Sequence, residues 1–260
     1  MSRGASVYYI LVLFIILSSG CSARRTADED QPASSAAGNT TVASTSEQPP
    51  RAPITWDDVA KAYERVRDYV CLYEKEERAI ANGERQTIRL SFRKPFDVRM
   101  EWLNERGTVD QTAVYRQGFN DSKVLGKRSG VFGALAGTVK LDPNDPLALE
   151  DSRHPITEAG LGQIIEHAAR DAANPQITNR FLGEETLDDN RPAYKFEFSA
   201  KEGAHLSDGP QAVRALVWID KQLMLPVKVE IYDSANALIE RHRFKDLRIN
   251  TKLTDKTFTL

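Results

Sequence analysis

Histidine side chains are the first groups to consider as carriers of catalysis or metal binding in this sequence. The four histidines are far apart in the chain, and none shares a metal-binding spacing such as H-x-x-x-H. We therefore read them as surface or satisfied core residues. They are His154, His167, His205 and His242.

Acidic side chains occur in pairs that adjoin strand or turn patterns, where solvated charge is their ordinary role. "DPNDP" at 142–146 lacks the further oxygen ligands and the glycine of a calcium loop, so we read it as a turn. No G-x-S-x-G, Walker loop, dinucleotide fingerprint or C-x-x-C is found. The sequence thus predicts no catalytic residue, metal or cofactor. An enzyme would require acidic residues and a histidine that converge in a polar cleft.

The cysteines indicate covalent chemistry of another kind. Cys21 directly follows an apolar run from Val7 to Leu17 and a small-residue site, Ser18 to Gly20. The run has about 11 residues, too few for a helix that spans a bilayer, and is typical of a signal peptide. A cysteine in this place resembles a bacterial lipobox, in which Cys21 would be acylated, for example with palmitate. An ordinary signal peptide with a chance cysteine is the alternative.

The chain then divides into three parts. Residues 1–20 are the predicted lipoprotein signal peptide, and residues 21–53 are rich in Ala, Ser, Thr, Gln and Pro, which favours a disordered tether. Residues 54–260 form one domain. We expect an envelope protein anchored through Cys21 and facing the periplasm, and Ser22 favours the outer membrane. Cys71 would then have no disulfide partner and is read as a buried thiol. The net charge of −2 favours neither nucleic acid nor a general electrostatic grip on lipid, and we expect a monomer.

Hydrophobic periodicity places the elements of this domain. A capping pair, Thr55 and Asp58, predicts a helix that continues to about Val70. Period-two alternation predicts strands at 87–93, 96–102 and 109–115, and a second helix is expected from about Thr157 to Ala173. Further strands are expected at 177–187, 194–198, 213–220, 227–231 and 238–249, the last with a bulge between Phe244 and Leu247.

This order predicts an α+β fold with a curved antiparallel sheet and two helices over its concave face. The glycine- and proline-rich stretch 130–155 has no sustained period and is interpreted as an irregular loop or a lid. A poorly defined connection is the alternative.

Two segments carry a family resemblance. "VWIDKQLMLPVKVEIYDSANALIERHRFKDLRINTKLTDKTF" (217–258) resembles the periplasmic lipoprotein carriers and sorting proteins of the LolA/LolB type. The stretches "YVCLYEKEER", "IRLSFRKPFDVRMEW" and "VYRQG" are similar to a poorly characterised envelope family usually grouped with that fold. The resemblance implies an open half-barrel whose apolar cavity, capped by helices, binds acyl chains, lipid or a lipoprotein. It transfers no binding residue.

The alternating apolar face supplies the candidate cavity lining, and a cavity of this kind would bind hydrocarbon. The alternative is an envelope interaction or sensor module in which the same side chains form a filled core. The candidate lid residues are Val131, Phe132 and Leu135. The candidate lining residues are Leu90, Phe92, Phe96, Val98, Met100, Trp102, Phe196, Phe198, Val227, Val229 and Ile231.

Overall fold

The computed structural model describes residues 52–78, 84–129, 137–150 and 152–260. These residues belong to one compact unit, Glu47–Leu260. The signal peptide, Cys21, nearly all of the expected tether and the candidate lid residues Val131, Phe132 and Leu135 lie outside the described residues. Within those ranges, no helix is both long and apolar enough to cross a membrane.

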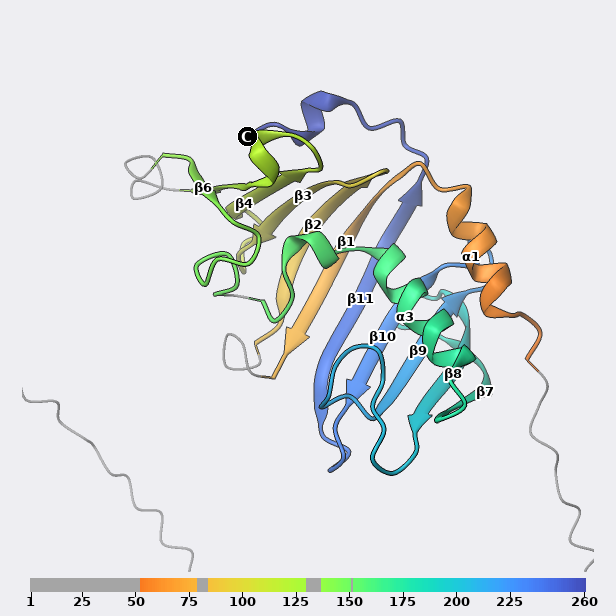
Figure 1. Ribbon diagram of the computed structural model, residues 1–260. Coiled ribbons are helices and arrows are strands. Elements are labelled where there is room, and N and C mark those ends of the chain that lie inside the picture. Colours follow the sequence, from red (N-terminus) through yellow and green to blue (C-terminus); the bar gives the residue numbers. More distant parts are fainter. Residues whose placement is uncertain (1–51, 79–83, 130–136, 151) are drawn as a thin grey trace, which may run out of the picture. The chain divides into compact units, whose positions relative to one another are not determined.

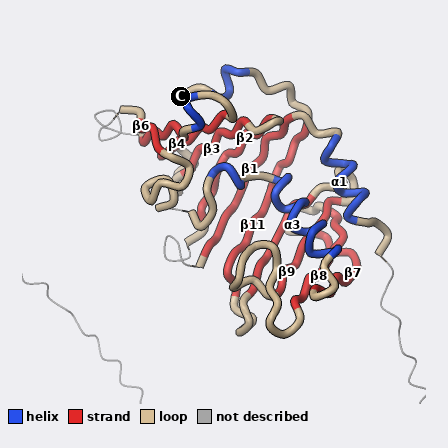
Figure 2. The backbone as a smooth tube through the Cα atoms, viewed as in Figure 1, coloured by secondary structure: helices blue, strands red, loops and turns tan. Residues whose placement is uncertain are grey.

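The centre of the fold is one antiparallel sheet of 11 strands, shown in red in Figure 2. Its order is β6-β5-β4-β3-β2-β1-β11-β10-β9-β8-β7, so the first and last long strands, β1 and β11, pair in the middle. The strands are β1 (Asp68–Glu77), β2 (Gln86–Arg93), β3 (Asp97–Leu103), β4 (Val109–Arg116), β5 (Val124–Arg128), β6 (Val139–Leu141), β7 (Ile177–Thr186), β8 (Pro192–Ala200), β9 (Arg214–Asp220), β10 (Pro226–Tyr232) and β11 (Leu238–Ile249).

Two α-helices lie over one face of the sheet, α1 (Trp56–Glu64) and α3 (Leu161–Ala173) (Figure 1). The α3 helix packs against α1, β7 and β10. Short 3-10 turns are η2 (Asn120–Ser122), η3 (Ile156–Glu158) and η4 (Asp255–Phe258). The sheet stays open, because β6 and β7 end its order, and the expected α+β half-barrel is confirmed.

Several local expectations are confirmed. The Thr55 hydroxyl accepts a hydrogen bond from the Asp58 amide, and the Asp58 carboxylate accepts one from the Thr55 amide, which completes a capping box. The α3 helix ends at Ala173, before Asn174 and a proline. The bulge in β11 falls at Asp246, whose φ is 51°.

Two helix boundaries were wrong. The first helix ends at Glu64 and does not reach Val70, because residues 68–77 alternate buried and half-buried side chains as the central strand β1. The second helix begins at Leu161, while Thr157 lies in η3. Gly160, with φ +103°, precedes it, and the Tyr69 hydroxyl accepts a hydrogen bond from the Leu161 amide. Strands β5 and β6 were not predicted either, since β5 is short and half-exposed and β6 has three residues.

Candidate functional site

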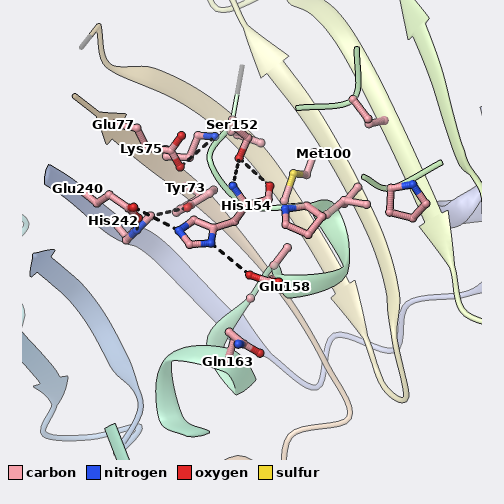
Figure 3. A pocket seen from close by; sticks show the side chains of 18 of the residues that line it. Tyr73, Lys75, Glu77, Met100, Ser152, His154, Glu158, Gln163, Glu240 and His242 are labelled. Carbon is pink, nitrogen blue, oxygen red and sulfur yellow. Dashed lines mark hydrogen bonds and ion pairs between the residues drawn. The ribbon is translucent and has the colours of Figure 1, made fainter. Parts of the chain in front are cut away.

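A cavity of about 590 Å³ lies on the helix-covered face of the sheet. The floor of the cavity consists of the central strands β1 and β11 and of neighbouring strands on both sides of them. Residues 152–160 and α3 supply further walls (Figure 3). This volume is within the range of about 300–1,000 Å³ for small-molecule pockets. Apolar walls include Ile88, Ala113, Val124, Ile156, Ile164, Ala215, Val217 and Phe244.

The candidate lining residues divide into two groups. One group lines the cavity, and its members are Met100, Trp102, Phe198, Val229 and Ile231. The other group packs into the apolar core and does not line the cavity; its members are Leu90, Phe92, Phe96, Val98, Phe196 and Val227. The apolar face is therefore partly filled core and partly cavity wall.

Polar side chains interrupt this apolar face on the two central strands. On β11, Glu240 and His242 occupy successive inward positions before Phe244, and on β1 Lys75 and Glu77 pair with them in register. The same rows continue onto apolar partners on β10, since Ile231 pairs with Glu240 and Val229 pairs with His242. Strand alternation thus carries four ionisable groups into the cavity.

Glu240 is the centre of this polar cluster, and its side chain is fully buried. His154 Nε2 lies 3.2 Å from Glu240 Oε1, and His242 Nε2 lies 2.9 Å from Glu240 Oε2. The Arg153 guanidinium also donates to Glu240 Oε1. Burial alone would raise the pKa of Glu240, but the hydrogen bonds from His154 and His242 outweigh burial and hold that pKa well below its usual range.

His154 is held between two carboxylates. Its Nδ1 lies 3.1 Å from Glu158 Oε2, opposite the contact with Glu240 (Figure 3). The hydrogen bond to Glu240 raises the pKa of His154 to about 9, although burial opposes the shift. His154 is therefore protonated at neutral pH.

A second acid faces the cluster from the loop that precedes β9. Asp208 Oδ1 lies 3.8 Å from His167 Nδ1, while the Gln163 amide donates to His167 Nε2 at 2.7 Å. Asp208 Oδ2 is buried and has no hydrogen-bond partner among the described residues. Burial raises the pKa of Asp208, and the nearby Glu240 charge raises it further.

Spacing in the sequence did not connect the four histidines, and the structure brings two of them together. His154 and His242 meet on Glu240 although they are 88 positions apart in the chain. The signal was present in β11, where Glu240 and His242 share the alternation that places Phe244 inward. The acidic pairs do form ordinary ion pairs, for example Glu184 with Lys221 at 2.6 Å.

The family model described as "Protein of unknown function (DUF1571)" matches residues 66–260. No curated protein matches the sequence. Among solved structures, the MucA/MucB complex of Pseudomonas aeruginosa is 16% identical with a TM-score of 0.45, and the match covers 79% of this chain and 59% of that chain. Lipoprotein LppX of Mycobacterium tuberculosis is 10% identical with a TM-score of 0.45, covering 76% of this chain and 94% of that chain.

A LolA superfamily protein of Nitrosomonas europaea is also similar, with 10% identity, a TM-score of 0.30, and coverage of 80% of this chain and 98% of that chain. The LolA-type likeness expected from the sequence is therefore found among solved structures. At these identities the likeness concerns the fold alone.

Proposed function

The chain belongs to the family described as "Protein of unknown function (DUF1571)", and we propose that it binds the hydrocarbon part of an amphiphile, such as an acyl chain or a lipid. The observation that carries this proposal is the cavity of about 590 Å³, whose walls are mostly apolar and include a polar cluster around Glu240. Apolar walls favour hydrocarbon, while the polar groups can orient a headgroup.

Burial of hydrocarbon supplies enough free energy for reversible binding. At about 0.8 kcal/mol per methylene, about 14 methylenes contribute ~11 kcal/mol. Association costs at least ~4 kcal/mol, which leaves ~7 kcal/mol, a Kd of about 10 μM. A longer chain or a second chain would bind more tightly.

Binding is favoured over catalysis by the state of Tyr73, a hydroxyl side chain that lines the cavity next to His242. Tyr73 Oη, His242 and Glu240 form a hydrogen-bonded chain, since Tyr73 Oη lies 2.7 Å from His242 Nδ1. Burial raises the pKa of Tyr73 well above 10, and the charges of Glu77 and Glu240 raise it further. A phenol in this state does not supply the phenolate that nucleophilic attack requires.

Attachment to the cell envelope is the second part of the proposal. Acylation of Cys21 would fix the chain to a membrane surface facing the periplasm, and residues 22–53 would let the domain stand off from that surface. Metabolic labelling with a radioactive fatty acid tests this directly. Label on the wild-type chain that is absent from Cys21→Ser supports the anchor, and equal label on both contradicts it.

Extraction of bound lipid tests the cavity. The full chain carrying Cys21→Ser is purified without detergent, and an organic extract is analysed by mass spectrometry. A stoichiometric fatty acid or phospholipid supports the proposal. An empty extract, together with no binding of a fluorescent fatty acid, contradicts it and favours an interaction module.

Two neighbouring substitutions on β9 provide a matched comparison. Ala215 lines the cavity, whereas Leu216 follows it on the opposite face. Ala215→Trp should reduce fatty-acid binding, and Leu216→Trp should leave it unchanged. Equal binding by the two variants, both with native circular dichroism, would remove the cavity as the binding site.

A further inference from the structure

We propose that His154, Asp208 and Glu240 form a binding site for a divalent transition-metal ion at the polar end of the cavity. Their ligand atoms come from three separate parts of the chain: the segment before η3, the loop before β9, and β11. One atom from each residue lies within 4.8 Å of the other two. All three residues line the cavity.

The donor distances are close to those that a metal requires. Bonds of about 2.1 Å in a tetrahedral site place donor atoms about 3.4 Å apart. His154 Nε2 and Glu240 Oε1 are already 3.2 Å apart. All three donor atoms lie within 4.8 Å of one another, and Asp208 lies on a loop, so a small movement of its side chain would bring them to that spacing. One imidazole and two carboxylates suit Zn²⁺ and its first-row neighbours.

Asp208 provides a second observation that is independent of the donor spacing. Its Oδ2 is buried and has no hydrogen-bond partner within the described part of the chain. A buried carboxylate oxygen without a partner costs free energy, and a cation at this position would remove that cost.

The groups behind two of the ligands, His154 and Glu240, are of the kind that orient metal ligands in proteins. His154 presents Nε2 to the site while Nδ1 faces the Glu158 carboxylate at 3.1 Å (Figure 3). The second oxygen of Glu240 is held by His242 at 2.9 Å, and His242 is held by Tyr73. A carboxylate behind a ligating imidazole fixes the ring and raises its basicity.

Arg153 limits the affinity of the site for a metal ion, because its guanidinium contacts Glu240 Oε1, the oxygen that would also bind the metal. A metal ion must therefore share or displace that contact and must take the place of the proton between His154 and Glu240. Three protein ligands leave further coordination positions, which is the arrangement of open metal sites rather than closed structural ones. Because the ligands line the cavity, an open position can accept a water molecule or an anionic headgroup.

Calorimetric titration of the chelator-stripped chain with Zn²⁺ alone tests the site. We expect one equivalent of Zn²⁺ to bind, and Co²⁺ to bind at the same place with the visible absorption of a low-symmetry site. Asp208→Asn and His154→Gln should each weaken binding at least ~10-fold, and Glu158→Gln should weaken it about 10–100-fold. His205→Gln is the matched control, since His205 contacts only a neighbouring backbone carbonyl among the described residues.

Asp208→Asn is the most informative variant because it should leave the fold intact. The Oδ2 atom of Asp208 accepts no hydrogen bond from the described residues, so the substitution breaks none there. The absence of Zn²⁺ binding to the stripped wild-type chain overturns the proposal, as does unchanged affinity in Asp208→Asn and His154→Gln. No lipid is added in this titration, so its outcome is independent of acyl-chain binding.

Discussion

Glu240→Gln should destabilise the protein strongly. The Glu240 side chain is fully buried and receives contacts from Arg153, His154 and His242. Glutamine keeps the shape and one acceptor oxygen but removes the negative charge that faces the Arg153 guanidinium and His154. Breaking a buried ion pair in this way costs about 3–5 kcal/mol.

For a domain of this size, the expected change is readily measured. A loss of 1 kcal/mol lowers Tm by about 2–4 °C in chains of 150–250 residues, so Glu240→Gln should lower Tm by about 6–20 °C. Urea unfolding in the presence of EDTA measures the change in free energy without a contribution from bound metal.

Glu158→Gln is the matched control, because Glu158 contacts the other nitrogen of the same histidine but its side chain is 43% exposed. It should cost no more than about 1 kcal/mol. If Glu240→Gln also costs less than about 1 kcal/mol, the cluster is not an ionic anchor of the fold and the reasoning fails.

Three further predictions concern other parts of the structure. Burial raises the pKa of the Cys71 thiol and keeps it unreactive. In a Cys21→Ser background, an alkylating reagent should therefore modify Cys71 only when the domain unfolds. Labelling of the native protein at the rate of a free thiol would contradict this prediction. A Cβ at Gly160, where φ is +103°, would lie 2.5 Å from Tyr69 Oη, whereas a Cβ at Gly183, where φ is +115°, would meet open space. Gly160→Ala should therefore lower the free energy of unfolding in urea by about 2–5 kcal/mol, and Gly183→Ala should lower it by about 1–3 kcal/mol. Equal losses in the two variants would refute the steric part of this reasoning. Burial raises the pKa of Glu230, but its hydrogen bonds and ion pairs outweigh burial and lower that pKa below 4.5. The stabilisation from ionised Glu230 is therefore present above pH 4.5 and is lost as the pH falls through the lowered pKa. The urea midpoint should consequently fall less between about pH 7 and about pH 3.5 in Glu230→Gln than in the wild type.

Hydrophobic periodicity in the sequence was sufficient to predict most of the sheet and the existence of both helices, although not their exact boundaries. It failed at residues 68–77 because Val66 and Val70 fit the helical spacing that starts at Trp56, while the central place of β1 in the sheet depends on its pairing with β11, which is distant in the chain. It could not separate Val229, which lines the cavity, from Val227, which is fully buried in the core two positions earlier. Both face inward, and only the path of residues 152–160 and α3 decides which space remains open.

The polar cluster around Glu240 consists of ionisable residues at inward strand positions, where apolar residues are the ordinary expectation. Its ionisable groups replace apolar residues on the inward face of the central strands, where well-packed apolar side chains of similar volume are often as stabilising as an ion pair, or more so. The requirement for stability does not explain Glu240 and His242 at these positions, since Phe244 on the same strand shows that an apolar residue fits this face. The Oδ2 atom of Asp208, buried and unpartnered among the described residues, adds a cost that packing alone would remove. The chain thus places charge where apolar side chains would stabilise the fold as well, which is the distribution expected of side chains that hold a ligand.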